Sequence, residues 1–138
     1  MGGRGSSSGI SVKGIHYGEE YSTLFMSGNI KFVKMNKIDG MNSATTAPME
    51  TMTKNRVYVT ISNDTGKPKF VSYYDKNNKR YKQIDLSGKT HYVGKKKLDP
   101  PHTHLGYEHE ENGSRRLSVK ERKMVANVWK LWDNHTSK

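Results

Sequence analysis

The stretch RVYVTISNDTGKPKFVSYYDKNNKRYKQIDL, residues 56–86, decides the fold of this chain. It holds three runs that are rich in β-branched and aromatic residues, RVYVTIS at 56–62, FVSYY at 70–74 and RYKQIDL at 80–86. Such residues favour strands, and the segments NDTG and DKNNK between the runs favour turns. Consecutive strands joined by short turns predict a three-stranded antiparallel meander.

Side chains on neighbouring positions of a strand point to opposite faces of its sheet. In the third run this alternation predicts two sets of side chains. One face would carry Tyr81, Gln83 and Asp85, and the other would carry Arg80, Lys82, Ile84 and Leu86.

Strand and helix patterns continue on both sides of the meander. Residues 21–35, YSTLFMSGNIKFVKM, hold two apolar runs around a Ser-Gly-Asn turn and predict a β-hairpin. Residues 118–121, SVKE, match a capping box, and the spacing of Val125, Val128 and Trp132 predicts an amphipathic helix. The expected fold class is α+β, with a small antiparallel sheet of about four to five strands packed against a C-terminal helix.

Length and composition bound the domain organisation. The 138 residues are 32% hydrophobic, with a mean hydropathy of −0.92, and are enough for one small core. Residues 1–20 begin with MGGRGSSSG and are predicted to form a flexible Gly/Ser-rich basic arm, and residues 21–138 a single α+β domain. Neither a membrane-spanning run nor a signal peptide is visible, and cysteine is absent. The expected location is the cytoplasm, without membrane association.

Positive charge dominates the chain and points to an anionic partner. Lysine and arginine number 24 against 13 acidic residues, a net charge of +11. Residues 76–97 hold many of these cations with a single acid, Asp85. The pattern predicts binding of nucleic acid, RNA or DNA, or of another polyanion. The residues expected to contact phosphates are Lys79, Arg80, Lys95, Lys96, Lys97, Arg115 and Arg116. A solvated strand edge that only discourages aggregation is the alternative.

Two histidines follow the stiff Pro100-Pro101 pair in an extended segment. His102 and His104 would therefore point to one side, with Thr103 opposite. Two imidazoles on one side suit a metal-independent ribonuclease, in which one accepts the proton of the 2′-hydroxyl and the other protonates the leaving oxygen. Lys82 or Arg80 would stabilise the phosphorane, and Asp85 would orient a histidine.

The same histidines have two other interpretations. With His91, His109, Glu108 or Glu110 they would make a zinc site, but the spacing matches no established structural motif. They would otherwise be loop residues that hydrogen-bond to the backbone. The sequence therefore predicts no bound metal and no cofactor.

Four segments carry a resemblance that spans nearly the whole chain. They are MGGRGSSSG at 1–9, METMTKNRVYV at 49–59, KQIDL at 82–86 and PHTHLGYEH at 101–109. With them the chain resembles a family of small proteins encoded by tailed bacteriophages and prophages of Gram-positive bacteria, often near the head genes. This resemblance implies a phage-encoded protein of the host cytoplasm or the virion, and no particular activity. A virion structural or host-interaction protein, with a phage or host protein as partner, is a third alternative.

A looser resemblance concerns only the strands and the Pro-His-x-His portion. This part is similar to ribonuclease toxin domains of the barnase–colicin–RelE type. The similarity implies RNA cleavage by Lys82, His102 and His104.

Overall fold

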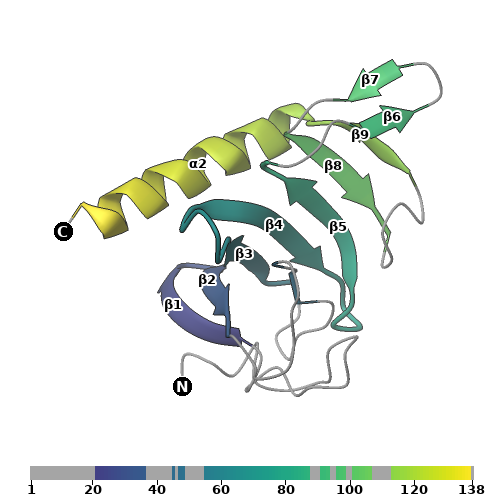
Figure 1. Ribbon diagram of the computed structural model, residues 1–138. Helices are drawn as coiled ribbons and strands as arrows, with labels where there is room; N and C mark the ends of the chain where they lie inside the picture. The colour runs from purple at the N-terminus through teal and green to yellow at the C-terminus, as the bar shows by residue number, and fades with distance from the viewer. Residues whose placement is uncertain are drawn as a thin grey trace.

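A seven-stranded sheet and a C-terminal helix form the body of the protein (Figure 1). The computed structural model describes residues 21–36, 45, 47–48, 55–87, 91–93, 96–98, 101–106 and 113–137. The strand order in the sheet is β1-β2-β3-β4-β5-β8-β9. Its strands are β1 (Tyr21–Ser27), β2 (Ile30–Met35), β3 (Val57–Ile61), β4 (Pro68–Tyr74), β5 (Arg80–Asp85), β8 (His102–Leu105) and β9 (Ser114–Arg116). Strands β6 (His91–Val93) and β7 (Lys96–Leu98) pair separately, and the helix is α2 (Val119–Thr136).

The predicted α+β class is confirmed, and so are its main local elements. Strands β3, β4 and β5 form the antiparallel meander, and β1 and β2 form the hairpin. Helix α2 begins after Ser118, whose side chain accepts a hydrogen bond from the Glu121 backbone in a complete capping box. Residues 1–20, the predicted arm, lie outside the described residues.

The sheet has seven strands, more than the four to five that were expected, and one pair of neighbouring strands is parallel instead of antiparallel. Strands β2 and β3 run parallel, with Ile30 opposite Val57. About twenty residues separate these strands along the chain, which is enough for the crossover that parallel pairing needs. Strands β8 and β9 are short and polar, so their sequences carry little strand signal. They extend the sheet because β8 pairs with the edge of the meander and β9 with β8.

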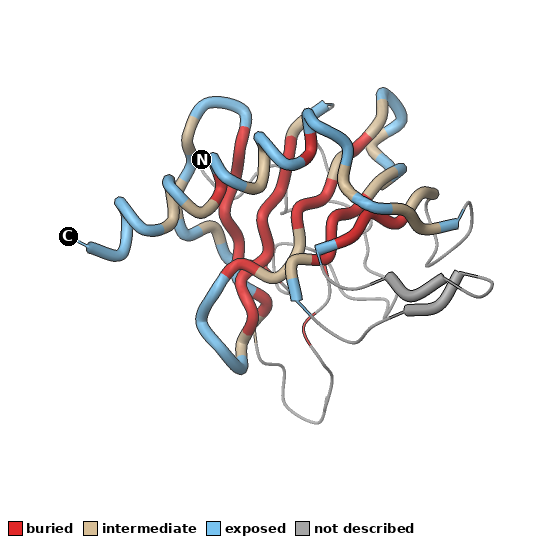
Figure 2. The backbone as a smooth tube through the Cα atoms, turned by 90° about the horizontal axis from the view of Figure 1, so that it is seen from above, coloured by how far each residue is buried: buried red, intermediate tan, exposed pale blue. Residues whose placement is uncertain are grey.

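The main core lies between the sheet and α2, on what we call the helix face. Val128 of α2 is fully buried against sheet residues that include Phe32, Val59 and Ile84. Trp132 stacks on Phe32 with ring centroids 6.0 Å apart. Figure 2, seen from above, shows buried residues along the middle strands and exposed residues on much of α2. Burial of this apolar surface is the main stabilisation of the domain.

A second cluster lies on the opposite side of the sheet, which we call the tyrosine face. Its buried members are Tyr21, Val33, Met35, Tyr58 and Tyr74. The Tyr74 hydroxyl donates a hydrogen bond to the Pro48 carbonyl oxygen. Strand β3 is buried along its whole length because both of its faces carry a core.

The turn between β3 and β4 depends on a glycine. Gly66 has a φ of +70°, in the left-handed region, and its amide donates to the Ser62 carbonyl oxygen. No atom lies within 4 Å of the place where a Cβ would stand, so the backbone conformation alone selects glycine there. In the described part of the chain, no helix combines the length and the apolar character needed to cross a bilayer.

Candidate functional site

The register of β5, β8 and β9 collects polar side chains on the tyrosine face. Asp85 lies opposite His102, and Gln83 lies opposite His104. His104 in turn lies opposite Ser114 of β9. Residues paired across a sheet share a face, so these five side chains point to one side. The predicted common side of His102 and His104 is confirmed by their contact.

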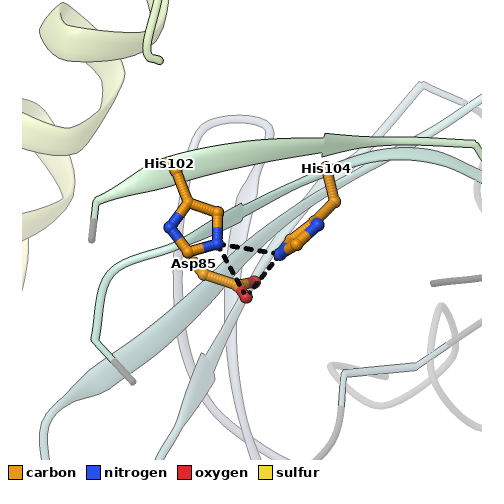
Figure 3. A group of neighbouring side chains, drawn as sticks. All are labelled: Asp85, His102 and His104. Atoms are coloured by element: carbon orange, nitrogen blue, oxygen red, sulfur yellow. Dashed lines mark hydrogen bonds and ion pairs between the residues drawn. The ribbon is translucent and has the colours of Figure 1, made fainter. Parts of the chain in front are cut away.

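Asp85, His102 and His104 converge at the centre of this group, which we call the Asp85–His102–His104 cluster (Figure 3). The His104 Nε2 atom is 2.8 Å from Asp85 Oδ2 and 2.9 Å from His102 Nε2. His102 Nε2 lies 3.7 Å from the same carboxylate oxygen. The two histidines are 1% and 4% exposed, so the cluster is nearly free of solvent.

Further side chains hold the cluster in place. The Ser114 hydroxyl is 2.7 Å from His104 Nδ1. The Gln83 side-chain amide donates to Asp85 Oδ1 at 3.0 Å, and Arg80 donates to Gln83 Oε1 at 2.8 Å. The contact of Ser114 fixes the orientation of the His104 ring, and the hydrogen bond from Gln83 fixes the orientation of the Asp85 carboxylate. Rigid support of this kind is typical of functional sites.

The carboxylate of Asp85 is kept in its charged form. Burial acts to raise the pKa of Asp85, but hydrogen bonds from His104 and Gln83 and the nearby charges of both histidines outweigh it. The net result is a pKa below the usual value. The cluster therefore presents one anionic oxygen and two imidazole nitrogens to a common point.

The contact between the rings bears on the predicted acid–base pair. A base and an acid that act on one phosphodiester must each reach a different oxygen atom. Direct contact of His102 Nε2 with His104 Nε2 at 2.9 Å fills the space where the phosphate would stand. The pair would have to separate before it could act on RNA.

Lys82 does not join the histidines, which corrects the predicted grouping. It precedes Gln83, so the alternation of β5 points it to the helix face, where its Nζ lies 3.0 Å from Glu121 Oε2. Its Nζ also lies 4.3 Å from the centroid of the Tyr73 ring. A cation held in this way on the far side of the sheet does not reach the cluster.

Glu121 organises a second network at the start of α2. Its carboxylate accepts two hydrogen bonds from Arg115, at 2.6 and 2.9 Å, and one from Thr103 at 3.0 Å. The backbone amide of Ser118 donates to it at 2.8 Å. Burial acts to raise the pKa of Glu121, but the hydrogen bonds from Arg115, Ser118, Lys82 and Thr103 outweigh it and lower the pKa to about 2. This network joins β5, β8, β9 and α2.

Arg80 lies on the other face from the one predicted. Because the pairing of β4 with β5 is irregular between Tyr73 and Tyr74, Arg80 pairs with Tyr74 and reaches Gln83 on the tyrosine face. It is thus nearer to the histidines than the simple alternation implies.

The other predicted phosphate contacts have different environments. Arg115 is bound to Glu121, whereas Lys79 and Arg116 are exposed. Lys96 and Lys97 lie in β7, but only their backbone is described. Lys95, Glu108, His109 and Glu110 lie outside the described residues, and His91 begins β6.

Sequence reasoning missed three members of these networks. Ser114 has no motif of its own, and only the pairing of β9 with β8 brings it to the cluster. Gln83 was predicted on the same face as Asp85, but not as its hydrogen-bond partner. Glu121 was visible as a capping residue, but its role as the partner of Lys82 and Arg115 depends on the docking of α2.

The chain matches no protein-family model, no curated protein and no solved structure.

Proposed function

We propose that this protein binds nucleic acid or another polyanion through exposed cations, chiefly those of α2. The observation that carries the proposal is the imbalance of exposed charge among the described residues. Their exposed acids are Asp64 and Asp133. Their exposed cations are Lys34, Lys67, Lys76, Lys79, Arg116, Lys120, Arg122, Lys123 and Lys130.

The fold adds to this imbalance. Glu121 and Asp85 are buried and are compensated by partners inside the protein. Two of the acids therefore do not offset the lysines on the surface. A surface with unopposed cations attracts phosphate groups by long-range electrostatics.

Three lysines of α2 lie along one stripe. Lys120, Lys123 and Lys130 are exposed and are spaced so that a 3.6-residue period places them on the same side of the helix. Asn127 and Asn134 continue the stripe with polar, uncharged side chains. Lys120 and Lys130 are about 15 Å apart along the axis, the length of about four nucleotide steps. The stripe therefore fits a nucleic-acid backbone.

Fluorescence anisotropy with labelled RNA and DNA tests the proposal. We expect the double variant Lys123→Gln/Lys130→Gln to weaken binding and to reduce the slope of log K against log salt by about 1 to 2, because two phosphate contacts are lost. The matched control is Lys34→Gln/Lys67→Gln, which removes the same charge from β2 and a turn. Equal slopes for both variants, or no binding by the wild type at low salt, would contradict the proposal.

A ribonuclease is the second candidate function. The observation that favours it is the hydrogen bond of Asp85 to His104, which would orient the imidazole and support its action as a base. We expect RNA cleavage that persists in chelator and is lost in His104→Gln, followed by gel analysis of labelled RNA. Cleavage that survives His102→Gln and His104→Gln together would remove this candidate. A virion structural or host-interaction role, with a phage or host protein as partner, stays a third prediction.

A further inference from the structure

We propose that Asp85, His102 and His104 bind one divalent transition-metal ion of the zinc class. Oδ2 of Asp85 and Nε2 of each histidine lie within 4.8 Å of one another and converge from β5 and β8 (Figure 3). This inference is independent of the polyanion surface, which lies on α2. It excludes the metal-independent ribonuclease, because the ion would occupy the nitrogen atoms that the acid–base pair needs.

The positions of the three atoms already suit a metal ion. Their separations are 2.8, 2.9 and 3.7 Å. These separations place the atoms on a circle of about 1.9 Å radius, so an ion about 0.8 Å out of their plane would have three bonds of about 2.0 to 2.1 Å. Zinc forms bonds of this length with histidine nitrogen and carboxylate oxygen. The separations therefore allow one ion to reach all three atoms.

Hydrogen bonds among these three atoms use their lone pairs less completely than a bound cation would. A neutral imidazole has one N–H and one lone pair, and an ionised carboxylate only accepts. If His104 Nε2–H donates to Asp85 Oδ2, one proton is shared among atoms that all face the same point. A second proton, on His102 Nε2, would meet the first across the 2.9 Å contact. A divalent cation uses all three lone pairs at once.

The residues around the cluster match what a metal site requires. A ligating histidine usually donates its other ring N–H to a neighbouring oxygen, which fixes its tautomer. Ser114 Oγ, 2.7 Å from His104 Nδ1, can accept that bond and leaves the Nε2 lone pair for the ion. Gln83 holds the second oxygen of Asp85, and Arg80 holds Gln83. These contacts form the outer layer of hydrogen bonds that keeps ligands in place.

The donor set selects the class of ion. Two imidazoles and a carboxylate suit zinc and neighbouring transition metals, whereas magnesium and calcium take oxygen ligands. Three protein ligands leave one position of a tetrahedral zinc site for a water molecule or a substrate oxygen.

Metal titration of the wild-type full chain tests the proposal first. After dialysis against chelator, we expect calorimetry to show one Zn²⁺ bound per chain and no comparable binding of Mg²⁺. Co²⁺ should give the visible absorption of a four-coordinate ion, and Zn²⁺ should abolish that absorption. Thermal unfolding should shift to higher temperature with Zn²⁺, because the ion binds the folded site. Less than one ion per chain, or a Co²⁺ spectrum without four-coordinate character, would overturn the proposal.

Variants then assign the ion to these residues. His102→Gln, His104→Gln and Asp85→Asn should each weaken Zn²⁺ binding by more than about 100-fold, and Ser114→Ala by about 10- to 100-fold. The control is His135→Gln, an exposed histidine of α2, which should bind like the wild type. Circular dichroism in chelator checks that each variant is folded. Wild-type Zn²⁺ affinity in a folded His102→Gln variant would refute the assignment. If the ligand variants do not fold, the Ser114→Ala variant tests the assignment instead. Unchanged Zn²⁺ affinity in Ser114→Ala would then refute it.

Discussion

Replacing Glu121 with glutamine should destabilise the protein at neutral pH and remove part of its acid sensitivity. The Glu121 carboxylate is 1% exposed and accepts hydrogen bonds from Arg115, Thr103 and the Ser118 amide, with Lys82 3.0 Å away. Glutamine keeps the shape and one oxygen but loses the charge that Lys82 and Arg115 require. The two cations would then lack their anionic partner.

The magnitude follows from the pKa of Glu121. It falls from 4.5 to about 2 in the folded protein. A lowering of this size corresponds to roughly 3 kcal/mol of unfolding free energy, as an upper estimate. Because the folded pKa is the lower one, this stabilisation is fully present above pH 4.5 and is lost as the pH falls through about 2. Less than half of this free energy should remain at about pH 3.

Urea unfolding of the wild type and Glu121→Gln at about pH 7 and pH 3 measures both quantities. The expected difference in unfolding free energy is about 3 kcal/mol at the higher pH and less than half of that at the lower pH. Asp133→Asn, an exposed carboxylate of the same helix, is the control and should change the free energy by less than about 0.5 kcal/mol. A variant within 1 kcal/mol of the wild type at about pH 7, or a difference that does not shrink in acid, would refute the reasoning.

Two other substitutions test the core and a turn. Ile84→Ala should lower the unfolding free energy by about 2 to 5 kcal/mol, because Ile84 is fully buried on the helix face, whereas Val119→Ala at an exposed site should change it by less than about 0.5 kcal/mol. Gly66→Ala should cost about 1 to 2 kcal/mol in urea unfolding through its φ of +70°, and a neutral effect would show that the turn adopts another conformation.

Most of the local structure was predictable because its signals are local. The β-branched and aromatic composition of residues 57–61, the strand at residues 80–85, the turns between strands and the capping box at Ser118 all depend on neighbours within a few positions. The polar strands β8 and β9 were not predicted as part of the sheet, because pairing with β5 and with each other makes them strands.

The candidate site was predictable in part. An extended His-x-His segment puts His102 and His104 on one side, and Asp85 was predicted as the partner of a histidine. The sequence does not show that Asp85 lies directly opposite His102, nor that Ser114 reaches His104. These contacts depend on the register between strands that are far apart along the chain.

The sequence by itself determined the strands of the meander, the first hairpin, the capped amphipathic helix and the positive charge. Only the tertiary structure decided that β2 and β3 run parallel, that Glu121 binds Lys82 and Arg115, and that Asp85 meets two histidines. The physical reason is the range of the interactions. Side-chain alternation and helix capping act between close neighbours, whereas register and the choice of face are set by burial between distant segments.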